Sequence, residues 1–502
     1  MDEFLNKVTM YRLLVYYLGG LLLISASFSA IGMLPYDPVN VLASAGFLIA
    51  VCWLSNIIFA RFWSVPPNAE SSLITALILS LIITPTWPDA SFFFLLWAGL
   101  LAMGSKYLLS VRGKHVFNPA AFGVAITALA LKDSATWWVA GNLPLMLFIL
   151  AGGILVVRKI HRTDLVIPFF AAGIISSLMF IPLTPQDVIS ALTATLLHTT
   201  LFFFGFVMLT EPLTTPPRRA GRIAYGALVG ILFAPWVHVG SLYFTPELAL
   251  LAGNVFSFLI SPKYKAVLQL SQVRKLANDT YEFIFSGRVP HFQPGQFAEW
   301  TLDADTSDSR GNRRWFTIAS SPTENDVRLG IKFYADPSTY KTFLADFRNG
   351  RKILTGSIAG DFTMPKNPKR KLAFIAGGIG VTPFRSMVKY LHDRNERRDA
   401  VLLYSNRSEA EIAYRDIFDA AERAGIGFRA HYTLTDKSVA PTWQGERGFV
   451  DANMITRTMP DYKERTFYIS GPPSMVGTFK HLLHEMGVPR RRIKTDYFPG
   501  FA

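Results

Sequence analysis

Three short stretches in the second half of this 502-residue chain hold residue types that bind phosphate groups and flat rings. The first, from Gly377 to Pro383, reads Gly-Gly-Ile-Gly-Val-Thr-Pro; it follows an apolar run and precedes a helical pattern. Glycines let the backbone approach a phosphate, and the N-terminus of the next helix supplies amides and partial positive charge. We therefore expect a dinucleotide to bind here, through Gly377, Gly378, Gly380, Thr382 and Pro383.

The second stretch is Arg314-Trp315-Phe316-Thr317, and the third is Gly471-Pro472-Pro473. A guanidinium such as that of Arg314 suits bidentate recognition of phosphate, and the ring of Phe316 offers a flat apolar surface. A further stretch, Tyr404-Ser405-Asn406-Arg407, ends an apolar run at a point where a ribose or its 2′-phosphate would lie. Arg407 either pairs with such a phosphate or is a solvated loop residue, which leaves NADH and NADPH both open.

These stretches need strands and helices to hold them. Residues 265–365 show short alternating runs separated by turn residues, which indicates an antiparallel β-barrel. Later apolar strands alternate with helical stretches, the pattern of a doubly wound parallel α/β sheet. We expect a barrel domain over 263–366 and an α/β domain over 367–502. The expected strands are 267–273, 281–285, 298–302, 372–376, 400–404, 428–434 and 466–470, and the expected helices are 382–395, 408–424 and a last one ending at 487.

In their order, these motifs resemble those of the ferredoxin–NADP reductase superfamily along nearly all of residues 263–502. The resemblance implies an FAD-binding barrel followed by an NAD(P)H-binding domain. It implies that Arg314 pairs with the FAD diphosphate, that Phe316 packs on the isoalloxazine ring, and that Thr317 hydrogen-bonds near its N5. Phe316 stands where a Tyr is commoner in the family, and Ser470 stands where a Cys is usual.

The resemblance also assigns roles to less distinctive positions. Ser338 and Thr339 resemble a second diphosphate segment that lacks the family's usual glycine, and Gly356 resembles part of the closing strand of the flavin domain. The tail resembles family tails whose aromatic ring covers the flavin, a role for Phe498 or Phe501. The implied catalytic residues are Thr317 and Phe501, and the implied cofactor-binding residues are Arg314, Phe316, Thr317, Ser338, Thr339, Gly356, Gly377, Gly378, Gly380, Thr382, Pro383, Ser405, Arg407, Gly471 and Pro472.

The first half has the composition of a membrane protein. Residues 1–265 hold 15 Lys+Arg and 10 Asp+Glu, whereas the rest of the chain holds 35 and 26. A helix that crosses the membrane needs about 20 apolar residues. Residues 1–262 contain ten apolar runs, some of them shorter than this. The expected polytopic α-helical domain has spans at 13–34, 39–60, 70–86, 90–110, 118–131, 143–157, 165–183, 187–209, 222–243 and 246–261.

Basic residues set the expected orientation of these spans. With a cytoplasmic N-terminus, the inner loops carry fourteen Lys and Arg residues and the outer loops carry only Lys132, a strong positive-inside bias. Both termini are then cytoplasmic, in a protein of the cell inner membrane surrounded by lipid. The net charge of +14 is explained by these retained basic residues and a basic dinucleotide-binding domain, so nucleic acid is not an expected partner.

Two polar stretches, 113–121 and 210–217, interrupt the apolar pattern. Such interruptions often mark binding sites in membrane proteins, but both also fit helix caps at the membrane surface. Residues 117–120, 208–212 and 221–228 resemble the membrane flavoprotein family that supplies flavin-carrying subunits to the sodium-pumping NADH:quinone reductase and to the Rnf complex. That family holds flavins in the membrane, one of them an FMN esterified to a Thr in a Ser-Gly-Ala-Thr-like motif.

Two threonines are candidates for this attachment. Thr136 lies in Ser134-Ala135-Thr136, which has the right place in the chain but lacks the glycine, and Thr193 matches the spacing but comes late. Hydroxyl residues at both places also fit ordinary helix caps. We therefore add Thr136 to the cofactor-binding residues, with a covalently bound FMN as one form of the membrane flavin.

Metal-based electron transfer has little support in the sequence. The only cysteine, Cys52, excludes a four-thiolate iron–sulfur cluster on this chain. Only His198 and His238 are expected within spans, whereas transmembrane ferric reductases usually show two histidines on each of two helices. No metal site is expected.

Taken together, these features predict a membrane-bound NAD(P)H-dependent flavin oxidoreductase. Electrons would pass from cytoplasmic NAD(P)H through FAD to a membrane flavin, and then to a quinone or an extracytoplasmic acceptor protein. Two alternatives stay open, a haem-type transmembrane ferric reductase and a redox-driven ion transporter.

Overall fold

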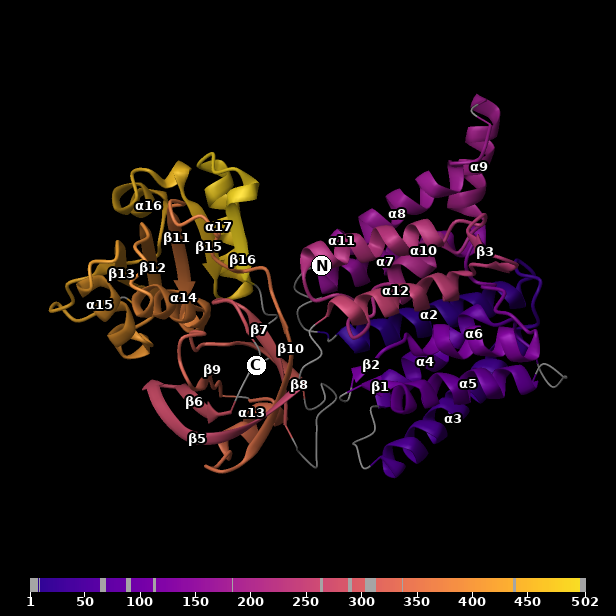
Figure 1. Ribbon diagram of the computed structural model, residues 1–502, viewed down its shortest axis with the longest axis horizontal. Coiled ribbons are helices and arrows are strands. Elements are labelled where there is room, and N and C mark those ends of the chain that lie inside the picture. Colours follow the sequence, from indigo (N-terminus) through magenta and orange to yellow (C-terminus); the bar gives the residue numbers. More distant parts are fainter. Residues whose placement is uncertain are drawn as a thin grey trace. The chain divides into compact units, whose positions relative to one another are not determined.

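The computed structural model describes residue 8 and residues 10–63, 69–86, 92–111, 114–182, 184–261, 265–287, 291–302, 313–335, 337–436 and 439–496. The chain divides into two compact units, Met1–Lys263 and Tyr264–Ala502. Figure 1 shows that the first unit is built of helices and that the second is built around sheets.

The helical unit contains a helix at each of the ten runs expected from the sequence. Three of its helices, α2, α3 and α7, are long and apolar enough to cross a membrane, and a bent pair could supply a fourth, counted over the described residues. The helices are α2 (Met10–Ala30), α3 (Pro38–Phe62), α4 (Ala69–Ile82), α5 (Phe92–Leu108), α6 (Pro119–Leu131), α7 (Leu143–Ile160), α8 (Thr163–Leu178), α9 (Pro185–Leu197), α10 (Leu201–Phe203), α11 (Arg219–Leu232) and α12 (Pro246–Ile260). Two short hairpins join them, β1 (Ser110–Val111) with β2 (Lys114–His115), and β3 (His238–Val239) with β4 (Leu242–Tyr243).

The run expected as one span at 187–209 is broken in the structure. Helix α9 ends at Leu197, and the chain resumes as α10 and a π-helix, Phe204–Met208, after a bend of 53° (Figure 1). The hydroxyl of Thr199 donates to Thr195 O (2.5 Å) and accepts from Leu201 N (3.3 Å). A side chain that bonds the backbone in this way competes with the helical pattern, so the break has a local cause that apolar composition does not reveal.

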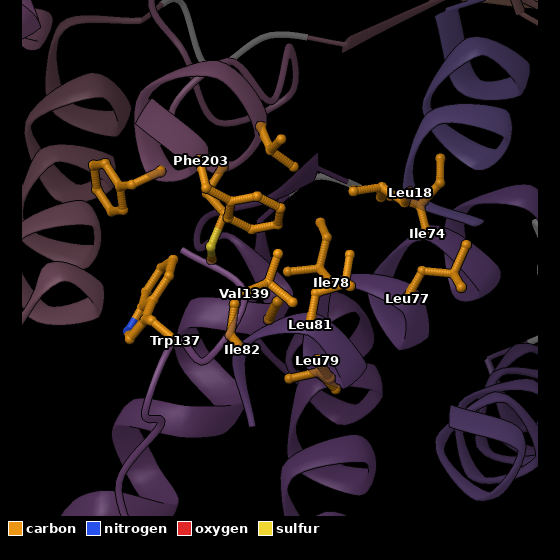
Figure 2. Packing of buried hydrophobic residues seen from close by; sticks show 14 of the residues in the cluster. Leu18, Ile74, Leu77, Ile78, Leu79, Leu81, Ile82, Trp137, Val139 and Phe203 are labelled. Atoms are coloured by element: carbon orange, nitrogen blue, oxygen red, sulfur yellow. The ribbon is translucent and has the colours of Figure 1, made fainter. Parts of the chain in front are cut away.

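Helix α4 forms the centre of the helical unit. Every residue from Ile74 to Ile82 is buried, and Figure 2 shows its Ile78, Leu81 and Ile82 in one cluster with Trp137 and Phe203. Its polar residues bond carbonyls of their own helix, as in the 2.7 Å bond from Ser80 Oγ to Ala76 O. A helix apolar on all sides is expected to be buried among others, and α4 fits this rule.

The C-terminal unit begins with a six-stranded antiparallel sheet of order β8-β7-β10-β5-β6-β9. Its two outer strands approach each other where Ala319 N donates to Arg328 O (2.9 Å), although no ladder joins β8 to β9 in the described residues. Inward-facing Leu268, Phe283 and Trp300 form its core. The elements are β5 (Lys265–Ala277), β6 (Thr280–Ser286), β7 (Phe297–Thr301), β8 (Arg313–Thr317), β9 (Val327–Lys332), helix α13 (Thr339–Ala345) and β10 (Lys352–Ala359).

A six-stranded parallel sheet follows, in the order β14-β13-β12-β11-β15-β16. The chain runs outward from β11 to β14 and then returns to β15 on the other side of β11, as the doubly wound pattern requires. Its strands are β11 (Leu372–Gly377), β12 (Ala400–Asn406), β13 (Phe428–Leu434), β14 (Glu446–Arg447), β15 (Thr466–Ser470) and β16 (Ile493–Asp496), and its helices are α14 (Thr382–Asp393), α15 (Arg415–Arg423), α16 (Ala452–Thr458) and α17 (Pro473–Glu485).

One expected helix, 408–424, is wrong in its first half. Helix α15 starts only at Arg415 because Tyr414 has a left-handed backbone, with φ of +61°. A bulky residue with positive φ interrupts a right-handed helix. The ring of Tyr414 is buried, and its burial holds this conformation in place.

Buried polar contacts join the two sheets of the C-terminal unit. Arg385 of α14 is 1% exposed; its guanidinium bonds both carboxylate oxygens of Glu324 and donates to Ala319 O (3.1 Å). Burial opposes ionisation of Glu324, but the hydrogen bond and charge of Arg385 hold its pKa below the usual range. Lys332 and Glu411 form a further ion pair at 2.9 Å. These contacts fix the antiparallel and parallel sheets to each other.

Candidate functional site

The glycine turn, Ser405 and the Gly-Pro stretch meet at one edge of the parallel sheet. Gly377 pairs with Ser405 across β11 and β12, and Ala376 pairs with Ser470 across β11 and β15. The carboxyl ends of these three strands therefore lie together, at the point where the order of successive strands in the sheet reverses. Open α/β sheets bind ligands at this place.

The turn and the Gly-Pro stretch pack backbone against backbone. A Cβ atom added to Gly380 would lie 2.5 Å from Ser470 O and 2.6 Å from Gly471 N, and one added to Gly377 would lie 2.2 Å from Met475 Sδ. Gly378 differs, because its φ is +52° and nothing lies within 4 Å of an added Cβ. The edge thus combines tightly fixed glycines with one open glycine, a surface that a phosphate can approach closely.

Thr382 and Pro383 start helix α14 directly after this turn. The hydroxyl of Thr382 donates to Ile379 O (3.2 Å), and Pro383 occupies a first-turn position, where its missing N–H leaves no helix bond unmade. Strand β9 of the antiparallel sheet lies against the same turn, since a Cβ on Gly330 would be 2.8 Å from Thr382 Cγ2. The fixed turn, the open Gly378 and the helix N-terminus fit a dinucleotide phosphate.

At the ribose end of the edge, Ser405 is half-buried and Arg407 is exposed. The carbonyl of Arg407 accepts from Asp436 N (3.0 Å), which fixes its backbone and leaves the guanidinium at the surface. The placement suits contact with a ribose or a 2′-phosphate.

The Arg-Trp-Phe-Thr stretch lies on the edge strand β8. Arg314 and Phe316 share one face of this strand, and both contact Tyr340 of α13, at 5.1 Å from the guanidinium to the ring centre and 5.8 Å between ring centres. Trp315 points the other way and is 41% exposed, whereas Thr317 is buried. Alternation along the strand therefore separates the Arg314–Phe316 face from the Trp315 face.

The second expected diphosphate segment is brought to the same place. Ser338 caps α13 by accepting from Lys341 N (3.4 Å), and it is buried, while Thr339 is half-buried. Tyr340, the next residue, is the one that Arg314 and Phe316 touch. Two stretches 24 residues apart in the chain thus form one surface, and this grouping matches the role that the sequence resemblance implies.

Lys341 is a member of this surface that the sequence analysis missed. It is 8% exposed, its Nζ donates to Lys332 O (3.0 Å) and lies 4.5 Å from the ring centre of Tyr334. Burial, with the nearby charge of Arg314, lowers the pKa of Lys341 to about 8. Two cations held close together in this way fit a diphosphate, which would favour their charged forms. A lysine three residues after Ser338 is the only sequence signal for it.

Other expected positions lie farther away or outside the described residues. Gly356 pairs with Glu299 of β7 and Lys265 of β5, so β7 stands between it and the β8 residues. Phe498 and Phe501 lie outside the described residues.

In the helical unit, the polar stretches 113–121 and 210–217 are brought together. His115 Nε2 lies 3.0 Å from Glu211 Oε1, which joins the two stretches directly. Asn118 caps α6 by accepting from Ala121 N (3.0 Å), so the interpretation as a helix cap is correct for this residue. The same residue has a second role, because its backbone N–H donates to Asn254 Oδ1 (2.7 Å) of α12.

Further buried side chains extend this arrangement. Asn254 Nδ2 donates to the hydroxyl of Tyr225 on α11 (3.0 Å), and Glu211 lies within electrostatic range of both Tyr225 and Lys106 of α5. The Nζ of Lys106 donates to the backbone oxygen and side chain of Ser71 at 3.0 Å each. We call the group the polar cluster; its members are Lys106, His115, Asn118, Glu211, Tyr225 and Asn254.

The two candidate attachment threonines differ in how their hydroxyls are used. Thr136 is exposed in the loop between α6 and α7, with its hydroxyl 2.8 Å from that of Thr84. Thr193 lies on α9, and its hydroxyl donates to Ile189 O (2.8 Å) of its own helix. Asn118 caps one end of α6 and Lys132 the other, so Thr136 and the polar cluster lie at opposite ends of that helix.

The expected placement of the histidines needs a correction. His238 is exposed on β3, because α11 ends at Leu232 and a hairpin follows it, so His238 does not lie within a helix. His198 caps the end of α9, at the break in the bent pair.

Comparison with known proteins finds a family match within each unit. Residues 139–266 match the NQR2, RnfD, RnfE family, and residues 374–481 match the oxidoreductase NAD-binding domain. The chain therefore joins a domain of the first family to a domain of the second, and the fusion expected from the motifs is confirmed.

Curated relatives match less than half of this chain, at 28% identity. The glycine betaine monooxygenase reductase subunit of Pseudomonas aeruginosa is 28% identical over 225 residues, which cover 44% of this chain and 60% of the relative. One subunit of the Na(+)-translocating NADH-quinone reductase of Yersinia pestis is 28% identical over 203 residues, 37% of this chain and 49% of the relative. The chain thus spans about half the length of the curated relatives it matches.

Among solved structures, the cytochrome P450 reductase GcoB of Amycolatopsis aligns with a TM-score of 0.42 and 21% identity. The alignment covers 47% of this chain and 70% of that chain.

Proposed function

We propose that this chain, which joins an NQR2, RnfD, RnfE family domain to an oxidoreductase NAD-binding domain, is a membrane-bound NAD(P)H-dependent flavin oxidoreductase. Its C-terminal unit oxidises NAD(P)H through FAD. Its helical unit receives the electrons on a membrane flavin and delivers them to a quinone or an extracytoplasmic acceptor.

The observation that carries this proposal is the common edge formed by the ends of β11, β12 and β15 beside strand β9. Gly377–Gly380, Ser405 and Gly471 converge there, and Gly330 of β9 packs on the turn. A dinucleotide bound at this edge would face the antiparallel sheet. That sheet carries Arg314, Phe316 and Thr317 on its outer strand.

Residues of the antiparallel sheet and of helix α13 would hold different parts of FAD. Arg314 and Lys341 offer two cations to the diphosphate, and Ser338 adds a capped helix start beside them. In this proposal Phe316 supplies the apolar face against which the isoalloxazine ring packs, and Thr317, the last residue of β8, contributes its hydroxyl near N5. Bound FAD supplies the redox chemistry itself, by accepting hydride and releasing electrons singly.

In the helical unit, the polar cluster is the favoured place for the group that receives these electrons. Its Asn254 lies on α12, less than two turns before the end of that helix at Ile260. Polar side chains that converge inside an apolar helical unit are costly and usually functional. Thr136, whose hydroxyl is exposed, is the favoured attachment point for FMN, and α6 separates it from the cluster by about 20 Å at 1.5 Å per residue.

We place the helical unit in the cell inner membrane, with ten spans and with both termini in the cytoplasm. The fourteen-to-one distribution of basic residues between the two sides supports this orientation. It brings the C-terminal unit to the compartment that holds NAD(P)H. The expected division of that unit into residues 263–366 and 367–502 is part of the same proposal.

The test is anaerobic reduction of the full-length protein in nanodiscs, followed by absorbance after addition of NADH or NADPH. We expect two flavins per chain to lose their yellow colour, first FAD and then the membrane flavin. The nucleotide that gives the faster first phase identifies the physiological donor. A preparation with a single reducible flavin, or one whose flavin is reduced by neither nucleotide, would contradict the proposal.

A further inference from the structure

A basic hollow in the C-terminal unit lies away from the dinucleotide edge. Its volume is about 390 Å³, and its walls come from β15, from the 3-10 turn Arg490–Arg492 and β16, and from the segment before β11. The lining residues are Pro365, Arg370, Thr466, Tyr468, Arg491, Arg492 and Lys494.

The hollow is at the opposite end of β15 from the dinucleotide edge. Thr466 starts this strand, whereas Gly471 follows its last residue, Ser470. Five residues of strand separate the two by about 16 Å. The hollow is therefore distinct from the site already described.

Two short segments concentrate positive charge around the hollow. Residues 365–371 and 489–494 each contain four Lys or Arg residues and no acidic residue. Lys371 is neutralised by Asp461 and Glu464, both at 2.8 Å. In the described part of the chain, no ion pair joins Arg370, Arg491 or Arg492 to an acidic side chain.

Backbone oxygens position the inner cations. Lys494 Nζ donates to Thr363 O (2.9 Å) and lies 5.0 Å from the ring centre of Tyr468, and Arg492 donates to Lys463 O. The hydroxyl of Tyr468 donates to the same Thr363 oxygen (2.8 Å). Burial lowers the pKa of Lys494, and the charge of Asp361 opposes this shift. The cations are thus held in place while their charge stays available to an outside anion.

We propose that this hollow binds the phosphate group of an anionic phospholipid, so that the C-terminal unit contacts the bilayer surface through it. Clusters of four to eight basic residues close to a membrane helix are typical of such binding. Helix α12 ends at Ile260 and β5 starts at Lys265, so the connection reaches at most about 18 Å. The charge also exceeds what a single free phosphate needs, since Lys366, Lys369 and Arg490 extend it beyond the hollow.

This inference rests on the membrane placement in the proposed function and is independent of the electron route. Because the only native cysteine, Cys52, is buried, a cysteine introduced at the surface can be labelled selectively. The exposed Asn367, between the basic residues, is changed to Cys and labelled with a polarity-sensitive dye. Ala424→Cys, at the exposed end of α15, is the matched control position.

The full-length protein is placed in nanodiscs of phosphatidylcholine, with or without about 30% phosphatidylglycerol. We expect the label at position 367 to report an apolar surrounding only with phosphatidylglycerol, and high salt to reverse the change. The R491E/R492E variant should abolish this response of the label, because each cation removed lowers the affinity for the anionic surface roughly fivefold. If the R491E/R492E variant does not fold, the milder R491Q/R492Q variant gives the same test. Lys480→Glu on α17 is the charge control.

Three results would overturn the inference: no change at position 367 with phosphatidylglycerol, an equal change at position 424, or an equal change from inorganic phosphate with phosphatidylcholine alone. The variants should reduce ferricyanide with NADH at the parent rate. Absence of ferricyanide reduction in the parent protein would contradict the proposed oxidoreductase activity, whereas the label reports only on the hollow.

Discussion

The dinucleotide edge of the C-terminal unit is built from backbone, whereas the polar cluster of the helical unit is built from side chains. At the edge, glycines 377 and 380 bring two chain segments into direct contact. In the cluster, His115 is hydrogen-bonded to Glu211 and Asn118 to Asn254, so residues of separate elements meet through side chains. The edge depends on space that a side chain would fill, and the cluster depends on hydrogen-bond partners. We therefore expect different kinds of substitution to disrupt the two sites.

The largest expected effect comes from filling the space at Gly380. In Gly380→Ala the new Cβ would overlap Ser470 O and the backbone of Gly471, which costs about 3 kcal/mol and moves the turn. Displacement of about 1 Å can reduce catalysis about 100-fold. We expect NADH:ferricyanide turnover to fall by about that factor, measured in detergent.

Gly477→Ala is the matched control for this change. Gly477 lies in α17, nothing lies within 4 Å of an added Cβ, and alanine favours a helix by about 1 kcal/mol. Turnover should stay at the parent level and the melting temperature should rise slightly. Equal damage from both substitutions would mean that glycine packing is not what shapes the edge.

Removing a partner from the polar cluster should have the next largest effect. Asn254→Leu leaves the Asn118 N–H and the Tyr225 hydroxyl without their bonds, at about 1–3 kcal/mol for each buried group. We expect NADH:quinone turnover to fall roughly tenfold while ferricyanide reduction by the C-terminal unit is unchanged. Ser27→Ala, which removes an exposed hydroxyl bonded to its own helix, should change neither rate.

These two sites also differ in how much of them the sequence predicts. The edge can be predicted from the sequence because Gly377–Pro383 is contiguous and lies between a strand and a helix. The observed strands 428–434 and 466–470 match the expected ones. In the cluster, the stretches around His115 and Glu211 and the run 221–228, which contains Tyr225, give a sequence signal. Lys106 and Asn254 have none, and only folding brings them to the others.

A smaller, pH-dependent effect is expected at Lys341. Its pKa of about 8, below the ordinary 10.5, means that charging this lysine opposes folding, so the stability of the FAD-free protein rises from pH 8 to 10.5. A bound diphosphate favours the charged form. FAD affinity should therefore fall as pH rises above 8, by up to about tenfold per pH unit.

Fluorescence titration with FAD at several pH values measures this dependence. In Lys341→Met, affinity at pH 7 should be lower and the slope above pH 8 should disappear. Lys480→Met, an exposed lysine on α17, should keep both. An unchanged slope in Lys341→Met would remove this lysine from the diphosphate site.

The smallest effect on folding is expected at Thr136. Thr136→Ala removes one exposed hydroxyl contact, so the free energy of unfolding should change by less than about 0.5 kcal/mol. The flavin fluorescence of the denatured chain in a gel should nevertheless disappear, whereas Thr193→Ala should keep it. A band that persists without Thr136 would place the attachment elsewhere, and no band in the parent would exclude a covalent flavin.

Several features could not be predicted because neither composition nor motif reveals their causes. The break between α9 and α10 lies in a run whose composition reads as continuous, and it depends on how Thr199 uses its hydroxyl. The late start of α15 depends on the burial of Tyr414. Lys341 carries no motif and gains its role from the fold around Arg314.

The contacts of Arg385 with Glu324 and Ala319, together with the Lys332–Glu411 pair, hold the two sheets of the C-terminal unit as one body. These contacts oppose a hinge that would swing the two sheets apart, so we expect nucleotide to be admitted and released without a change in their relative position.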